Sequence, residues 1–125
     1  MGRVRENIEV NGRQCWTLFD TGARNTYIVP EVAPLLLPFN LKVPHKSAMG
    51  GGVKEAKQAA VLEATIVGCP ITTHALVLDE IGRGEEGKMI EVLFGALAMR
   101  QWGIRPIPDL EKLDTSHYSK DFVEF

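Results

Sequence analysis

Residues 15–23 constrain the fold more than any other stretch, because an apolar run there ends on an acid, a hydroxyl residue and a glycine. The run predicts a buried strand that carries Asp20 to the edge of a packed core, and a rigid element of this kind is a good support for a catalytic group. Gly22 permits a turn that residues with a Cβ disfavour, and Thr21 can hydrogen-bond across that turn. Asp20 is therefore the candidate catalytic residue; the alternative is an ordinary aspartate that caps a turn after a strand.

Composition places the chain among ordinary globular domains. It has 125 residues, 45% of them hydrophobic and 24% charged, which fits one domain. The net charge of -2 and the lack of a basic patch argue against nucleic-acid binding, and no apolar run approaches the ~18 residues that a membrane span needs. Cys15 and Cys69 are expected to be buried free thiols, which suits the cytoplasm or another reducing compartment. The histidines and cysteines show no ligand spacing, so we expect no metal and no cofactor.

The pattern along the chain predicts mainly β-structure. Asn11-Gly12 is a strong hairpin signal because both residues tolerate positive φ. The expected strands are residues 4–10, 14–19, 25–29, 58–67, 71–78 and 92–94. Good helix formers predict one helix over residues 96–102 that ends at Gly103, with Leu97 and Trp102 facing inward. Residues 30–38 are expected to be irregular or one helical turn with the leucines in the core, and residues 79–91 a mobile surface loop.

Two motifs carry a resemblance to a known family. Leu18-Phe19-Asp20-Thr21-Gly22-Ala23 resembles the catalytic turn of aspartic proteases, with alanine after the glycine as in the retroviral branch. Val92-Leu93-Phe94-Gly95-Ala96-Leu97 resembles the strand, glycine and helix that this fold places behind its active-site turn. The resemblance covers about the first hundred residues. It implies a single-lobe, retropepsin-like closed β-barrel with one short C-terminal helix and a glycine-rich flap hairpin. The expected division is a protease domain over residues 1–108 and a C-terminal extension over residues 109–125.

A run of three glycines is the second candidate site. Gly50, Gly51 and Gly52 follow Met49 and predict a flexible tip. They lack the lysine and hydroxyl residue of a phosphate-binding loop. The resemblance implies a flap that closes over substrate, with residues 49–52 as its contacts. The alternative is a loose surface loop.

One catalytic acid implies two chains. Hydrolysis of an amide needs an activated water and a protonated leaving nitrogen, and two carboxyls that share one proton supply both. The sequence offers one suitable turn, because Asp114-Thr115-Ser116 lacks the glycine and reads as a turn acid. The second carboxylate must come from another copy across a two-fold axis. The resemblance implies a homodimer in which Thr21 locks the two turns together and Gly22 binds the substrate backbone, with residues 4–10 or 122–125 interleaving between copies.

The sequence departs from the retroviral pattern at two linked positions. Arg24 stands where those enzymes have an acid, and Ala96 where they have the arginine that pairs with it. Loss of both partners is self-consistent, since loss of one would leave a charge uncompensated. Arg24 and Asn25 are subsite candidates, and Arg24 either favours acidic or polar substrate side chains or simply lies exposed.

Three hypotheses about function follow. The first is a dimeric, metal-independent aspartic endopeptidase that hydrolyses peptide bonds in extended polypeptide. The alternative is a non-catalytic dimerisation or peptide-binding module that retains the protease fold, because a fold does not fix a function. The third is a domain of a larger polyprotein, which changes the context and leaves the chemistry unchanged.

Overall fold

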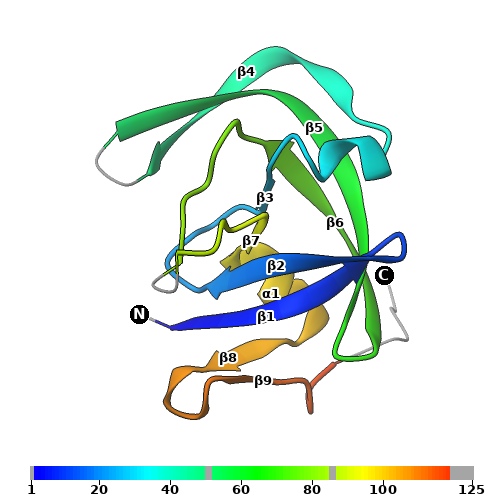
Figure 1. The fold of residues 1–125 in the computed structure, drawn as a ribbon, viewed down its shortest axis with the longest axis vertical. Coiled ribbons are helices and arrows are strands. Elements are labelled where there is room, and N and C mark those ends of the chain that lie inside the picture. The colour runs from blue at the N-terminus through cyan, green and yellow to red at the C-terminus, as the bar shows by residue number, and fades with distance from the viewer. Residues whose placement is uncertain (1, 50–51, 85–86, 119–125) are drawn as a thin grey trace.

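The sheet closes on itself in the computed structural model, which describes residues 2–49, 52–84 and 87–118. Within these residues the main sheet has seven strands in the order β1-β2-β7-β3-β6-β5-β4. A further pairing of Glu9 on β1 with Thr65 on β5 joins the two sides into a barrel-like ring (Figure 1). The expected all-β fold is therefore confirmed.

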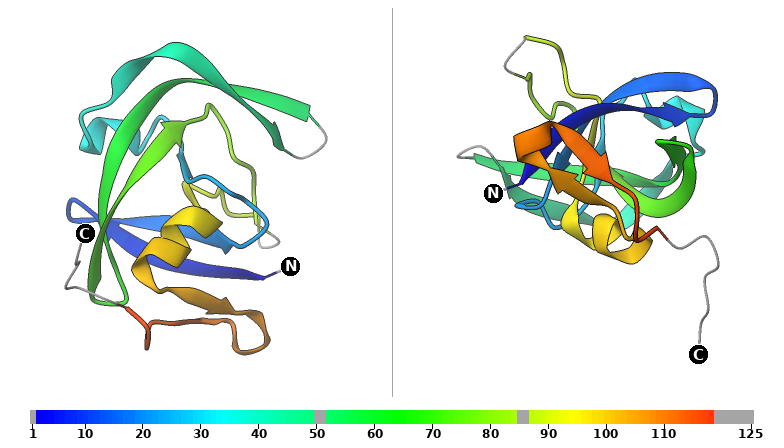
Figure 2. Two further views of the ribbon diagram at one scale, coloured as in Figure 1. Left: turned by 180° about the vertical axis from the view of Figure 1, so that it is seen from behind. Right: turned by 90° about the horizontal axis from the view of Figure 1, so that it is seen from below.

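Strands with similar bounds are present at four of the expected places, residues 4–10, 14–19, 71–78 and 92–94, whereas the strands over residues 39–49, 105–107 and 112–114 were not among the expected ones. The sheet strands are β1 (Arg3–Val10), β2 (Arg13–Asp20), β3 (Tyr27–Ile28), β4 (Phe39–Met49), β5 (Gly52–Ile66), β6 (Cys69–Val77) and β7 (Val92–Phe94). A separate two-stranded sheet pairs β8 (Arg105–Ile107) with β9 (Lys112–Asp114). The helices are α1 (Ala96–Trp102) and the short 3-10 turns η1 (Ala33–Leu35) and η2 (Pro108–Leu110). Figure 2 shows α1 against the outside of the ring, next to the β8–β9 hairpin.

The first hairpin fixes the position of Asp20. Asn11 and Gly12 have φ of 51° and 85°, the conformation of the tight hairpin turn that this dipeptide predicts. The register continues without a bulge from Val10 opposite Arg13 to Arg3 opposite Asp20.

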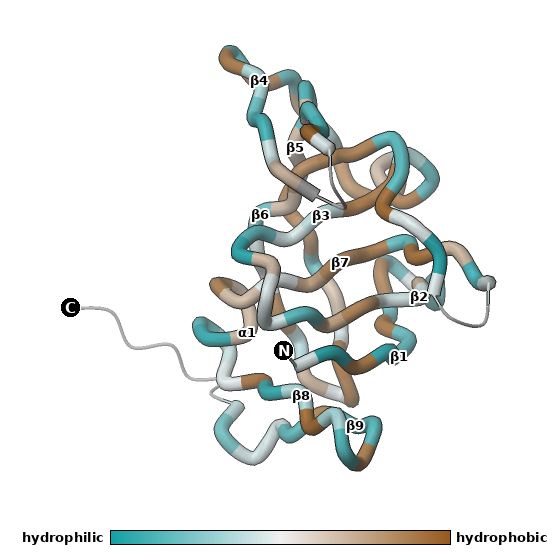
Figure 3. The backbone as a smooth tube through the Cα atoms, turned by 90° about the vertical axis from the view of Figure 1, so that its left-hand side faces the viewer, coloured by the Kyte–Doolittle hydropathy of each residue, from teal (hydrophilic) through white to brown (hydrophobic). Residues whose placement is uncertain are grey.

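β7 lies at the centre of the molecule. It pairs in parallel with β2 and antiparallel with β3, and all three of its residues are buried. The rings of Phe19 and Phe94, directly opposite in the register, are 5.2 Å apart at their centroids. Figure 3 shows this apolar strand between neighbours of mixed polarity. The end of β2 is thus supported by a fully buried strand of the core.

Three expectations need correction. The strand expected over residues 25–29 is shorter and comprises only β3; before it, the Thr26 side chain accepts the Gly95 N–H and the Thr26 carbonyl accepts the Leu76 N–H. Leu97 is 45% exposed, since α1 turns Ala98 and Met99 to the core. The leucines after Pro34 do not act together: Leu36 is buried, whereas Leu37 is 95% exposed beyond the end of η1.

The remaining segments are placed as follows. β5 begins at Gly52 rather than at 58 because it continues into the arm of a long hairpin with β4. The β8–β9 hairpin spans Pro108, and the division of the chain there stays a prediction. The suggested strand at 122–125 lies outside the described residues. No helix in the described part of the chain is long and apolar enough to cross a membrane.

Candidate active site

Asp20 is the last residue of β2, and its side chain is fixed by the turn that follows. The residue is 6% exposed. Its Oδ1 accepts a hydrogen bond of 2.8 Å from the Gly22 N–H, and its carbonyl accepts one of 3.1 Å from the Ala23 N–H. Its Oδ2 lies 3.4 Å from the Nε of Arg3, the residue opposite it on β1. The carboxylate is therefore held in one orientation at the end of a rigid strand.

The loop after Asp20 rests on the start of α1. The N–H groups of Ala96 and Leu97 donate to the carbonyls of Ala23 and Arg24, at 2.7 and 3.1 Å. These N–H groups have no partner within the helix, so the loop satisfies them. In turn, the Gly95 N–H donates to the Thr26 Oγ at 3.1 Å. The strand-glycine-helix motif thus positions the loop that follows Asp20.

Gly95 allows this close approach. A Cβ at this position would lie 2.1 Å from the carbonyl oxygen of Asn25 and 2.8 Å from that of Arg24, which is far inside van der Waals contact. The glycine is therefore required by the backbone of the loop.

Asp20 opens onto a cleft of about 790 Å³. The described residues that line it come from the end of β2, the loop of residues 22–25, the arms of the β4–β5 hairpin and the loop after β6, segments that surround one side of the ring in Figure 1. Its apolar floor includes Leu18, Ile90 and Leu93, which belong to a buried cluster separate from the main core. A cleft with an apolar floor and a fixed carboxylate is suited to an extended peptide.

Two side-chain contacts join the segment that follows Asp20 to the β4–β5 hairpin. The Tyr27 hydroxyl and the Ser47 Oγ are 2.7 Å apart, and the Asn25 Nδ2 is 3.5 Å from the His45 Nε2. Because β4 carries both Ser47 and His45, these contacts fix the height of the hairpin arm over Asp20.

Comparison with solved structures identifies relatives of the fold. The retroviral protease-like domain of Ddi1 from Leishmania major superposes with a TM-score of 0.65 at 13% identity, over 93% of this chain and 90% of that one. EIAV protease, solved in complex with the inhibitor HBY-793, superposes with a TM-score of 0.57 at 19% identity, over 84% and 92%.

The chain has a retropepsin-like fold. At the level of sequence, no family model matches the chain and no curated protein matches it. The fold recognised from two short motifs is thus confirmed by three-dimensional similarity alone.

Within the retropepsin-like fold, the expected site residues divide into two groups. Asp20, Gly22, Ala23, Arg24 and Asn25 all line the cleft. Thr21 is exposed, and its hydroxyl lies 3.0 Å from the backbone N and 3.3 Å from the backbone O of Gly2. Its role as a lock between two copies stays a prediction.

The expected flap is a hairpin whose arms are described and whose tip is not. Met49 pairs with Gly52 at the base of the tip, and Gly50 and Gly51 lie outside the described residues. The described hairpin residues that line the cleft lie further down the arms, at His45, Lys46, Ser47, Ala48 and Lys54. Substrate contacts by residues 49–52 stay a prediction.

Several cleft residues were not found from the sequence. Arg3 had a usable signal, because a two-residue turn at Asn11-Gly12 fixes the register and places residue 3 opposite residue 20. Tyr27 and Ser47 had none, since their contact depends on how the long hairpin bends over the ring.

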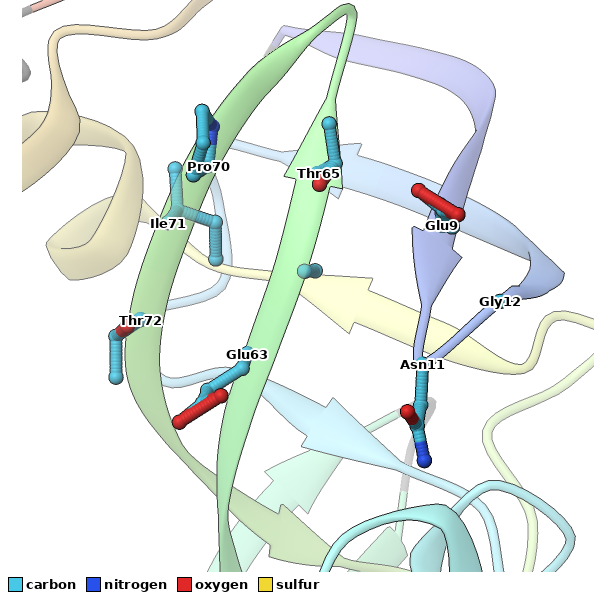
Figure 4. Close-up of a pocket in the computed structure, with 9 residues that line it drawn as sticks. Glu9, Asn11, Gly12, Glu63, Thr65, Pro70, Ile71 and Thr72 are labelled. Atoms are coloured by element: carbon cyan, nitrogen blue, oxygen red, sulfur yellow. The ribbon is translucent and has the colours of Figure 1, made fainter.

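A second cavity lies far along the ring from Asp20. It has a volume of about 340 Å³ and is lined by residues near the Asn11-Gly12 turn and the β5–β6 turn. Figure 4 shows that its carboxylates, Glu9 on β1 and Glu63 on β5, do not converge on one point. The described residues contain no group of His, Cys, Asp or Glu side chains that could hold a metal ion.

Asp114, in the motif that imitates a second catalytic turn, is a turn acid as expected. Its Oδ1 accepts the Ser116 N–H at 2.9 Å, and its hydrogen bonds to Ser116 lower the pKa of its carboxyl. Cys15, on β2, is buried in the main core, and burial raises the pKa of its thiol. Cys69 is part-exposed, so the expectation of two buried thiols holds for Cys15 alone.

Proposed function

We propose that the chain is an aspartic endopeptidase that works as a homodimer with one Asp20 from each copy. The observation that carries the proposal is the fixed Asp20 carboxylate at the base of a peptide-sized cleft in a retropepsin-like fold. Among the described residues that line the cleft, Asp20 is the one carboxylate. A two-carboxylate mechanism therefore needs a second copy.

The chemistry divides between the two carboxyls. The ionised one accepts a proton from a water molecule while the water oxygen attacks the peptide carbonyl carbon, and the protonated one donates its proton to the carbonyl oxygen. The C–N bond of the tetrahedral intermediate then breaks as the nitrogen takes a proton from the pair. The Gly22 N–H, bonded to Oδ1, holds each carboxylate in orientation throughout.

One observation favours the alternative of a non-catalytic peptide-binding or dimerisation module. Asp20 already has a cationic neighbour within its own chain, since Arg3 Nε lies 3.4 Å from Oδ2. An acid with such a partner can serve the structure alone. Only the protease proposal predicts that removing the negative charge of Asp20 abolishes cleavage.

The test compares Asp20→Asn with the wild type on a mixed peptide library over a range of pH. Asparagine keeps the shape and the acceptor for Gly22, so the variant should fold and should lose cleavage by at least about a thousandfold. Asp114→Asn is the matched control, because the same change in the imitation motif lies outside the cleft, and it should cleave like the wild type. Equal cleavage by Asp20→Asn would contradict the proposal, and cleavage by none of the proteins would favour the binding module.

A further inference from the structure

The described residues that line the cleft carry charges of nearly one sign. Five of them are arginine or lysine, and Asp20 is the one carboxylate among them. The five cations are Arg3, Arg24, Lys46, Lys54 and Arg83. The whole chain has a net charge of -2, so this cationic rim is a local feature and does not reflect a basic protein.

Two of these cations are available to a ligand. Among the described residues, Arg24 and Lys54 make no ion pair. Lys54 stands opposite Ser47 in the β4–β5 register and shares its face of the hairpin, whereas Lys46 shares the other face with Glu55. Lys54 is only part-exposed, and a cation near an apolar wall gains more from a carboxylate than one in open water does.

The cations surround the apolar floor from different segments. Arg24 follows the Asp20 turn, while Lys54 lies on the β5 arm of the hairpin. Beneath them, Leu18 and Leu93 are at most 7% exposed. An occupant that satisfies both features has an apolar side chain for the floor and carboxylates on its flanks.

We propose that the cleft selects acidic peptide segments, in which glutamate or aspartate flanks an apolar residue. The claim that such peptides are cleaved preferentially rests on the proposed function. The claim that they bind preferentially rests on the cleft alone. A cleft lined by one sign of charge also raises the local concentration of ligands of the opposite sign. A second copy across a two-fold axis would present the same rim to the other half of the peptide.

The first experiment measures binding with the Asp20→Asn protein, so that no peptide is consumed. The probes are three fluorescent peptides with the same apolar centre and with glutamate, glutamine or lysine on its flanks. We expect the glutamate peptide to bind about tenfold more tightly than the glutamine peptide at low salt, from a few exposed ion pairs, and the lysine peptide most weakly. The advantage should largely disappear at about 0.5 M salt.

Variants locate the effect. Arg24→Gln combined with Lys54→Gln should reduce the preference for glutamate over glutamine by roughly fivefold. Lys42→Gln combined with Lys112→Gln makes the same change in net charge on exposed residues outside the cleft, and should leave the preference unchanged. Equal affinity for the glutamate and glutamine peptides, or an equal effect of the control pair, would overturn the inference.

Cleavage of the same three peptides by the wild type separates the two proposals. Cleavage that ignores the flanking charge would overturn the acidic preference and leave the protease standing. A binding preference for glutamate without cleavage of any peptide would support the acidic cleft and count against the protease.

Discussion

Gly95 is the residue on which the position of the loop after Asp20, residues 22–25, depends most directly. Its missing Cβ lets the carbonyls of Arg24 and Asn25 approach the start of α1, and its N–H holds Thr26. The residue lies far from Asp20 in sequence and does not line the cleft. Its effect on activity is therefore exerted through the loop.

We predict that Gly95→Ala destabilises the fold and abolishes cleavage. The new methyl group cannot avoid the backbone oxygen of Asn25 unless the loop moves, so the free energy of unfolding should fall by about 3 kcal/mol or more, and the melting temperature by roughly 10 °C. Gly12→Ala is the control. Its φ of +85° makes alanine strained, but its surroundings are open, so it should cost only about 1 kcal/mol and retain cleavage. Thermal melts and peptide assays check both, and a fully active Gly95→Ala would contradict the account.

At the scale of elements, the sequence predicted the features that depend on residues close together in the chain. Asn11-Gly12 set the first hairpin and its register, and the helix formers at residues 96–102 with Gly103 after them set α1, whose C-cap has the expected left-handed φ of 67°. The Asp20 turn was found because its residue types are unusual together. The inward orientation predicted for Leu97 was wrong, because orientation around a short helix depends on the sheet beneath it, whereas Trp102 packs part-buried against the core as expected.

The contacts between β3 and the hairpin were beyond prediction for the same reason. Tyr27 and Ser47 meet only because β4 and β5 bend over the ring, and this bend is a property of the closed sheet. Such a contact between two elements gives a test of how the hairpin arm contributes to activity.

We predict that Tyr27→Phe lowers kcat/KM about fivefold, the equivalent of one hydrogen bond of ~1 kcal/mol. Ser47→Ala should have a similar effect, and the double variant should be no worse than either single one because the two side chains act on the same contact. Tyr118→Phe is the matched control: its hydroxyl binds the carbonyl of Pro70, away from the cleft, so stability should fall and kcat/KM should not. Additive losses in the double variant would show that the contact does not position the hairpin.

At the scale of the whole molecule, the ring leaves Asp20, the one carboxylate among the described residues of the cleft, near an exposed turn. Thr21 and Gly22 are both exposed beside the buried Asp20. In a homodimer these residues would face their copies, and the catalytic pair would exist only in the assembled form. Activity should then depend on the state of association as well as on the folded chain.

Mixing wild type with Asp20→Asn should therefore inhibit the wild type. When subunits exchange freely, an equal amount of variant puts half of the wild-type chains into mixed dimers, which lack one acid of the pair. If the total concentration keeps all chains dimeric, activity per wild-type chain should fall about twofold, and further as the variant is added in excess. Asp114→Asn, added in the same amounts, should not lower it. Specific activity of the wild type alone should also decline on dilution. Activity that is unaffected by the Asp20 variant and constant on dilution would mean that a single chain contains the complete site, and would overturn the dimer.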